Sequence, residues 1–311
     1  MKGVIYSLPR WLEGISEAQM KWRGVCFLNV CILIGPLALQ VAAQAGSATS
    51  VPVEHVYAKP GGVELKVYIF SPQPQKTPQT RAAIILFHGG GWTLGEPQWA
   101  FSRAQHFAEL GLVAVAAQHR LSDEKKGITP LEAMADARAA IRWMRTNAVS
   151  LGIDPKRIGA YGWSAGAHLA VCAAIFDDAD ADSRISAAPN ALVLVSPAVS
   201  LGRDRWLARL LGTRARASEI SPDEHVRGGL PPTLVLQGSH DTVTPLDGVK
   251  RFCERMRAAG NRCELHVYER FGHLFTPAGT PDDGWPKPDP ATQSDAMARV
   301  DSFLKSLGFI N

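Results

Sequence analysis

Residues 157–176 read RIGAYGWSAGAHLAVCAAIF, an apolar run that turns through a serine between two glycines into a second apolar run. The first run predicts a strand and the second predicts a helix. A strand that turns sharply into a helix crowds its own backbone, and Gly162 and Gly166 leave room on either side of the turn. The hydroxyl of Ser164 is then lifted above the sheet. This stretch therefore predicts a nucleophile at the carboxyl end of a buried strand.

Similar apolar runs recur along the chain, with helical stretches between them. They are AAIILFH from Ala82, LVAVAA at 112–117, ALVLVS at 191–196, TLVLQG at 233–238 and the more polar CELHVYE at 263–269. Before them, GGVELKVYIFSP alternates apolar and polar positions, as a half-exposed antiparallel strand does. Continuous apolar runs suit strands that are covered on both faces. The alternation predicts an α/β fold with a mostly parallel sheet, whose chemistry gathers at the carboxyl ends of the strands.

A second strand end carries the sequence HGGGW, from His88 to Trp92. Three consecutive glycines leave backbone N–H groups that no side chain obstructs. Such donors can hold the oxyanion that forms when an ester carbonyl is attacked. A flexible glycine loop or a phosphate cradle is the alternative, although no Gly-Lys-Ser follows. We expect His88 to order the loop and Trp92 to shape the floor of the site.

Two further strand ends supply an acid and a base. Asp241 follows TLVLQG by two residues, and His273 lies in the loop after the last predicted strand. A serine hydroxyl is a weak nucleophile without a base. His273 would take its proton and Asp241 would orient the imidazole and stabilise its charged form. His168 and His240 are rival bases and Asp247 is a rival acid, but only His273 directly follows the last strand.

With these four strand ends placed, the chain resembles serine esterases of the α/β-hydrolase fold. The HGGGW loop makes it most similar to the group of hormone-sensitive-lipase-like esterases and bacterial feruloyl and acetylxylan esterases. The likeness runs from about Val63 to Gly308. It implies a sheet of about eight strands, helices on both faces and a minimal cap. It also implies a triad and an oxyanion hole made by backbone N–H groups: Ser164, Asp241 and His273, with Gly89, Gly90 and Ala165.

The segment Leu201–Pro232 is the main material for a cap over the site. A thin cap implies an open cleft, which favours short acyl groups, including acetyl or feruloyl esters of plant cell-wall sugars. Four tryptophans are candidates for contact with substrate: Trp92, Trp163, Trp206 and Trp285. Trp206 could equally line an acyl pocket or pack against the body. Trp285 lies in a proline-rich stretch after His273, where it either stacks on a ring or belongs to a plain surface loop.

Other functions remain open on the same fold. An aryl formamidase, a peptidase or an amidase uses the same triad chemistry, and a non-catalytic binding protein keeps the fold without it. The histidines do not fall at zinc spacing and no cofactor motif stands out, so we expect neither a metal nor a cofactor. The 33 Lys and Arg residues are scattered among 29 Asp and Glu residues, so no nucleic-acid partner is expected. The expected partner is a small-molecule or carbohydrate ester.

The N-terminal region has the pattern of a secretory signal peptide. From Met20 a positive head, MKWR, precedes an apolar run and a small-residue exit, Ala43-Gln44-Ala45. A membrane anchor is the alternative, but the run is short for a span of roughly 20 residues. We expect residues 1–45 to be removed, with Met20 as the true start. A single catalytic domain, 46–311, would then be periplasmic or secreted, without stable membrane insertion.

Removal of the signal would leave three of the five cysteines, Cys172, Cys253 and Cys263. Exported proteins meet an oxidising compartment in which thiols tend to pair. Cys253 lies in a helical pattern and Cys263 opens the strand after the turn AAGNR, so the two could meet across that turn. We expect a Cys253–Cys263 disulfide, with two free and partly buried thiols as the alternative. Cys172 lies on an apolar helix and is expected to be core.

Overall fold

The computed structural model describes residues 51–73, 80–176, 185–281 and 284–311. Ser50–Thr280 and Pro286–Asn311 form one compact unit, which contains the strands and helices of the described residues. The described residues Pro281, Gly284 and Trp285 fall outside this unit and belong to a smaller one. The predicted signal peptide lies outside the described residues and stays a prediction.

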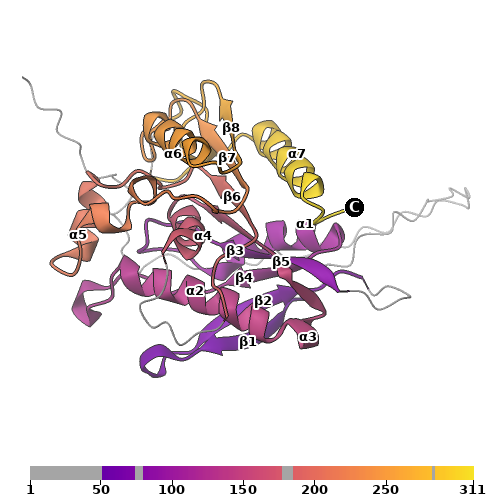
Figure 1. Ribbon diagram of the computed structural model, residues 1–311. Helices are drawn as coiled ribbons and strands as arrows, with labels where there is room; N and C mark the ends of the chain where they lie inside the picture. The colour runs from indigo at the N-terminus through magenta and orange to yellow at the C-terminus, as the bar shows by residue number, and fades with distance from the viewer. Residues whose placement is uncertain (1–50, 74–79, 177–184, 282–283) are drawn as a thin grey trace, which may run out of the picture. The chain divides into compact units, whose positions relative to one another are not determined.

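One sheet of eight strands runs through the larger unit, in the order β1-β2-β4-β3-β5-β6-β7-β8 (Figure 1). β2 pairs antiparallel with β1 and β4, and the other neighbouring strands are parallel. This confirms the predicted mostly parallel sheet. The strands are β1 Val53–Ala58, β2 Leu65–Phe70, β3 Arg81–Phe87, β4 Val113–Ala117, β5 Ile153–Trp163, β6 Ala191–Val195, β7 Thr233–Gly238 and β8 Cys263–Tyr268.

Helices cover both faces of the sheet, as predicted (Figure 1). α1 and α7 pack on one face, and α2, α4 and α6 pack on the other. The α-helices are α1 Phe101–Glu109, α2 Pro130–Thr146, α3 Ala148–Leu151, α4 Ala165–Ile175, α5 Arg205–Leu211, α6 Leu246–Ala258 and α7 Pro290–Ser306. Within the described ranges, no helix is both long and apolar enough to cross a bilayer.

The apolar run of β3 divides between the two faces because successive strand side chains point in opposite directions. Ile85 and Phe87 belong to the core under α2, α4 and α6, whereas Ile84 and Leu86 belong to the core under α1 and α7. All four are fully buried, and each such side chain contributes roughly 2 kcal/mol of hydrophobic free energy. The continuous apolar run is therefore the sequence signature of a strand between two helical layers.

α4 is the central helix of the fold. Every residue from Ala165 to Ile175 is buried, which is why its sequence is apolar all round. α2, which packs beside it, is amphipathic and begins at a capping box in which Thr129 and Glu132 each bond the other's backbone. The position of α4 fixes the nucleophile, because this helix begins directly after Ser164.

One strand of the fold differs from the sequence expectation, whereas the cap is thin as expected. β1 was not predicted, because its side chains are mostly exposed and form no apolar run. The cap segment, Leu201–Pro232, contains α5 and two single turns of 3₁₀ helix, Ala217–Ile220 and Pro222–Glu224. α5 has only seven residues, so little structure covers the carboxyl edge of the sheet here.

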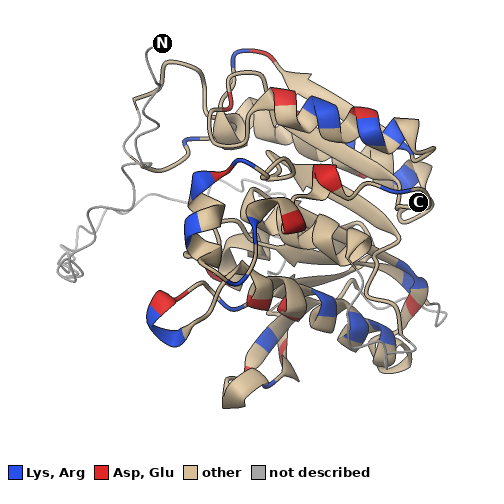
Figure 2. Cartoon of the chain, turned by 60° about the vertical axis from the view of Figure 1, so that its left-hand side comes forward, with Lys and Arg blue, Asp and Glu red and all other residues tan. Residues whose placement is uncertain are grey.

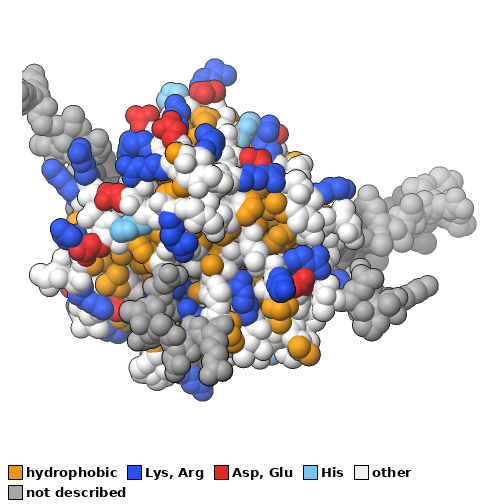
Figure 3. All heavy atoms as spheres, viewed as in Figure 1, with side chains coloured by type: hydrophobic (Ala, Val, Ile, Leu, Met, Phe, Trp, Pro, Cys, Tyr) orange, Lys and Arg blue, Asp and Glu red, His pale blue; other side chains and the backbone are white. Residues whose placement is uncertain are grey.

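Charges of both signs are interspersed over the surface. Lysines and arginines alternate with acidic residues along α6 (Figure 2). Figure 3 shows the same mixture on the face it presents, with small apolar areas between the charged side chains. The face shown therefore presents no single-sign charged area.

Candidate active site

The candidate nucleophile lies on a strained turn between β5 and α4. Ser164 has φ 52° and ψ −122°, a backbone conformation that is rare for residues with a side chain. A Cβ atom on Gly162 would overlap the carbonyl of Gly166. A Cβ on Gly166 would in turn overlap the carbonyl oxygens of Phe87 and His88 at the end of β3. Both glycines of the G-x-S-x-G pattern are therefore required by close backbone approach.

Three distant side chains meet at this turn. The Nε2 atom of His273 lies 3.0 Å from Oγ of Ser164, and its Nδ1 atom lies 2.9 Å from Oδ2 of Asp241. The carboxylate is buried and the imidazole is 14% exposed. The structure thus brings together the three residues that the sequence predicts for the triad, in hydrogen-bonding order.

The carboxylate of Asp241 is held ionised by its surroundings. Its Oδ1 accepts the backbone N–H groups of Val243 and Thr244, at 2.9 and 2.8 Å. Its Oδ2 accepts from the Thr244 hydroxyl and from Nε2 of Gln237. Burial alone would raise the pKa of Asp241, but attraction to His273 and these hydrogen bonds outweigh burial and lower the pKa below its usual 3.8. The rival acid, Asp247, is exposed in the first turn of α6.

Sequence reasoning missed a buried serine that joins the acid loop to the base loop. Ser196, directly after β6, accepts the Thr244 hydroxyl at its carbonyl and the backbone N–H of Leu274 at its Oγ, both at 3.1 Å. Leu274 and Phe275, next to His273, have φ 51° and 64°, so this loop is strained and needs such support. A polar residue at the end of a fully apolar strand was the available signal.

The HGGGW loop supplies free backbone donors beside the nucleophile. Among the described residues, the N–H groups of Gly89, Gly90 and Ala165 donate no hydrogen bond. Gly90 has φ 114°, and a Cβ there would overlap the carbonyl of Leu94. A Cβ on Gly89 would lie 2.8 Å from the Trp163 ring. The loop therefore needs glycine for its path, and the open N–H groups can bind an oxyanion.

Among the described residues, the imidazole rings of the rival histidines make no hydrogen bond to Oγ of Ser164. His168 is fully buried, and burial lowers its pKa to about 4. His88 stacks on His119 with ring centroids 4.2 Å apart, and burial lowers its pKa to about 3. His240 is exposed beside the Ser239 hydroxyl. The buried histidines are thus neutral supports near the HGGGW loop, as expected for His88.

The four candidate tryptophans differ in accessibility. Trp92 and Trp163 are 4% and 7% exposed, so little of either ring is open to a substrate. The Trp163 ring also carries the guanidinium of Arg103, 5.0 Å from its centroid. Trp206 is partly buried, and its indole Nε1 donates to the carbonyl of Gly91 at 3.1 Å. Trp285 is 53% exposed in the smaller unit, and a role for it in binding stays a prediction.

The predicted cysteine pair is brought together in the core. The Sγ atoms of Cys253, on α6, and Cys263, at the start of β8, lie 2.6 Å apart. Both are thiols in the structure, since a disulfide needs a separation of about 2.05 Å. Cys172 is fully buried, and burial raises its pKa well above the usual value. The disulfide remains a proposal, whereas Cys172 lies in the core as expected.

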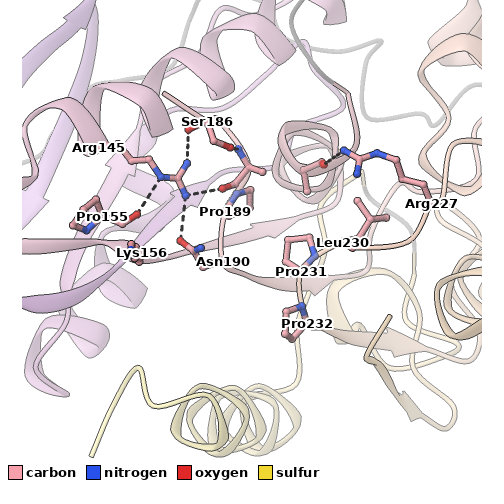
Figure 4. Close-up of a pocket in the computed structure, with 13 residues that line it drawn as sticks. Arg145, Pro155, Lys156, Ser186, Pro189, Asn190, Arg227, Leu230, Pro231 and Pro232 are labelled. Carbon is pink, nitrogen blue, oxygen red and sulfur yellow. Dashed lines mark hydrogen bonds between the residues drawn. The ribbon is translucent and has the colours of Figure 1, made fainter. Parts of the chain in front are cut away.

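Two cavities lie at opposite edges of the sheet. One of about 610 Å³ is lined by residues that precede β6 and β7, such as Asn190 and Pro232, and so lies at the amino ends of the strands (Figure 4). Arg145 there donates to the carbonyls of Pro155 and Ala188 and holds the wall together. The other, of about 160 Å³, lies between the residues after β6 and those after β7, and Thr244 connects it to the triad. This second cavity therefore lies at the same edge of the sheet as the three candidate triad residues.

In the described part of the chain, no three His, Cys, Asp or Glu side chains cluster in a way that could hold a metal ion. The arrangement has the parts that acyl transfer needs: a serine, an imidazole within reach of it, a buried acid and open amide donors. The chemistry that these residues can perform is nucleophilic attack on a carbonyl.

Comparison with known proteins agrees with the fold. The structure of Thermogutta terrifontis esterase 2 phosphoramylated by tabun matches with 35% sequence identity and a TM-score of 0.75 over 84% of this chain and 97% of that one. Other structures of the same esterase are described as propionate bound and butyrate bound. Fold, site and neighbours together define a carboxylic ester hydrolase.

The sequence also identifies the protein family. The pattern of the family described as alpha/beta hydrolase fold matches residues 84–277. The chain belongs to this alpha/beta hydrolase family. It is 24% identical to the isoprenylcysteine alpha-carbonyl methylesterase ICME of Arabidopsis thaliana, over 87% of this chain and 67% of that protein. It is 28% identical to the probable carboxylic ester hydrolase LipM of Mycobacterium tuberculosis, over 65% of this chain and 51% of that protein. The chain thus spans about half to two thirds of the length of these relatives.

The buried histidines predict a loss of stability in acid. The pKa of His168 is about 4 in the folded chain and 6.5 in an unfolded one. As the pH falls from about 6.5 to 4, the unfolded chain binds a proton that the folded chain does not, and the free energy of unfolding drops by roughly 3 kcal/mol through this residue alone. His168→Gln should therefore show a flatter dependence of unfolding free energy on pH.

The measurement is denaturant unfolding at several pH values between 7 and 4.5. Because the substitution also removes hydrogen bonds, the slope with pH is compared and not the stability at one pH. His240→Gln, at an exposed histidine, is the matched control and should keep the wild-type slope. Identical slopes for His168→Gln and wild type would contradict the assignment of a neutral buried imidazole.

Proposed function

We propose that the protein is a serine carboxylesterase for short-chain esters, with Ser164, His273 and Asp241 as its catalytic triad. Oγ of Ser164 attacks the ester carbonyl while Nε2 of His273 takes its proton. Asp241 stabilises the imidazolium that forms. The open N–H groups of the HGGGW loop and of Ala165 receive the oxyanion. His273 then gives the proton to the leaving alcohol, and water attacks the acyl-enzyme by the same steps.

One observation carries this proposal. The imidazole of His273 bridges Ser164 and Asp241 at 3.0 and 2.9 Å, beside amide N–H groups that have no acceptor among the described residues. A base, an acid and open N–H donors are all arranged around the hydroxyl of Ser164. A non-catalytic binding protein with the same fold would have no need of this arrangement. A strained backbone at Ser164 adds support, since such strain persists where function requires it.

The thin cap supports short acyl groups. The cap segment has one helix of seven residues, and the cavity next to the triad measures about 160 Å³, space for a small group only. The Thermogutta neighbour is described with propionate and with butyrate bound, acids of this size. Acetyl or feruloyl esters of plant cell-wall sugars remain our proposed natural substrates, because an open cleft accommodates a bulky alcohol.

The nucleophile is tested by substitution. Ser164→Ala should abolish labelling by a fluorophosphonate probe and lower kcat for p-nitrophenyl acetate by roughly 10⁴-fold or more. Ser150→Ala, at an exposed serine on α3, is the matched control and should react like wild type. Continued labelling of Ser164→Ala at the wild-type rate would exclude Ser164 as the nucleophile.

The acyl preference is tested with p-nitrophenyl esters of increasing length. We expect kcat/KM for acetate or butyrate to exceed that for palmitate about tenfold or more, because the small cavity excludes a long chain. Acetylated xylan, feruloyl esters and N-formylkynurenine assayed in parallel would separate sugar esterase from formamidase activity. A preference for palmitate would contradict the short-acyl proposal.

Export is proposed from the signal-peptide pattern of the sequence. The Cys253–Cys263 disulfide is proposed from the sequence as well, and the proximity of the two Sγ atoms supports it. We expect the exported protein to begin near Gly46 and, when denatured without reductant, to contain one titratable thiol, that of Cys172. N-terminal sequencing and thiol titration of protein recovered from the cell exterior or periplasm measure both. An intact Met1 or Met20 would contradict cleavage, and three titratable thiols would contradict the disulfide.

A further inference from the structure

The HGGGW loop is tied to the cap segment by two indole N–H groups. Nε1 of Trp206, on α5, donates directly to the carbonyl of Gly91 at 3.1 Å. Nε1 of Trp92, within the loop, donates to Nδ1 of His168 at 3.3 Å. The other ring nitrogen of His168, Nε2, lies 2.9 Å from the carbonyl of Ile220 in the cap segment. Both bonds therefore lead from the oxyanion loop to the cap.

The ring of His168 can make both bonds only as one tautomer. Nδ1 must accept from Trp92, so Nε2 carries the proton and donates it to Ile220. The ring is fully buried, on the first turn of α4, and burial keeps it neutral. Sγ of Cys172 lies 3.2 Å from the same Nε2, one helical turn further along α4. His168 therefore joins three segments: the loop, the nucleophile helix and the cap.

The loop needs such ties because its own sequence gives it freedom. A run of glycines loses more backbone entropy on ordering than other residues do. Trp92, at the end of that run, has φ 63°, a conformation that a bulky residue adopts only when it is held there. The bonds from Trp206 and to His168 act on the peptide and side chain that follow the proposed oxyanion donors, Gly89 and Gly90. They hold those N–H groups in one direction.

The cap segment is itself firmly seated, so it can serve as an anchor. Leu207, Leu211 and Ile220 are buried in the same core cluster as α4. Arg214 pairs with Glu132 at the start of α2, 2.6 Å apart. The part of the chain that carries Trp206 and accepts from His168 is thus fixed to the body of the protein.

We propose that Trp206 and His168 are positioning residues for ester hydrolysis, coupling the seated cap segment to the orientation of the oxyanion donors. Neither touches the reacting atoms. The inference rests on the proposed esterase function and goes beyond it, because it gives the cap a role in transition-state stabilisation in addition to shaping the cleft. The hole is complete when the cap is docked, and it loosens when either indole bond is lost.

The experiment removes the Trp206 N–H and keeps an aromatic ring in its place. Trp206→Phe in the full chain should lower kcat for p-nitrophenyl acetate roughly tenfold, part of the 10²–10³-fold loss that follows removal of a whole oxyanion donor. KM should stay within about twofold, since a ground-state ester gains little from the hole. The inhibition constant of a trifluoromethyl ketone, which forms an oxyanion adduct on the serine, should rise by a similar factor as kcat falls.

Controls separate this role from a general packing defect. Trp143→Phe changes a tryptophan of α2 that contacts His55 instead of the site, and it should leave kcat, KM and the inhibition constant at wild-type values. His168→Leu should reproduce the split between kcat and KM. Thermal unfolding establishes that each variant is folded, and if His168→Leu fails to fold, Trp206→Phe decides the matter alone.

The outcomes are distinct. Wild-type kcat and inhibition in Trp206→Phe overturn the inference and leave the esterase function standing. A rise in KM with unchanged kcat and inhibition also overturns it, because Trp206 would then bind substrate. A wild-type protein that neither hydrolyses p-nitrophenyl acetate nor reacts with a fluorophosphonate overturns the proposed function, and this inference falls with it.

Discussion

The site depends on one backbone contact, the packing of Gly166 beneath the end of β3. Because Gly166 has no side chain, the first turn of α4 lies directly against the carbonyls of Phe87 and His88. That contact places the nucleophile turn and the HGGGW loop side by side, although they are far apart in the sequence. A larger residue would push the two segments apart, and Ser164 would lose its donors before any side-chain chemistry was changed. The arrangement of the site therefore requires that the backbone at Gly166 can approach the end of β3 closely.

Around that contact, the parallel strands place five loops at one edge of the sheet. In the proposed mechanism, the loops after β3 and β5 carry the oxyanion donors and the nucleophile, and those after β7 and β8 carry the acid and the base. The loop after β6 carries Ser196, which supports them. Ser196 shows how they are held in register, since its carbonyl and its hydroxyl bond the acid loop and the base loop respectively. A triad on loops can thus keep hydrogen-bond distances because buried backbone and hydroxyl groups, and not only the catalytic side chains, fix its geometry.

Much of this could be predicted from the sequence, because the physical causes are local. A strand covered on both faces must be a continuous apolar run, and a sharp strand-to-helix turn must have glycine near its serine. β1 could not be predicted in this way, because an edge strand with mostly exposed side chains has no continuous apolar run in its sequence. The supporting roles of Ser196, Thr244 and Gln237 could not be predicted for a different reason. The hydrogen-bond partners of these polar residues are defined only when the loops have come together in the fold. The bond between Trp206 and Gly91 likewise depends on how the cap docks, which composition does not determine.

The histidines show how position, not residue type, assigns chemistry in this protein. His88 and His168 are buried without an acidic side chain that could stabilise their charged form, so burial keeps them neutral and suits them to structural hydrogen bonds. At His119, burial lowers the pKa although Asp136 acts in the opposite direction. His273 differs because a buried carboxylate faces one ring nitrogen and the serine hydroxyl faces the other. Gaining a proton therefore creates a stabilised ion pair at His273, whereas at His168 it would break the bond from Trp92. In the proposed mechanism, the same imidazole group is a base at His273 and a fixed support at His168.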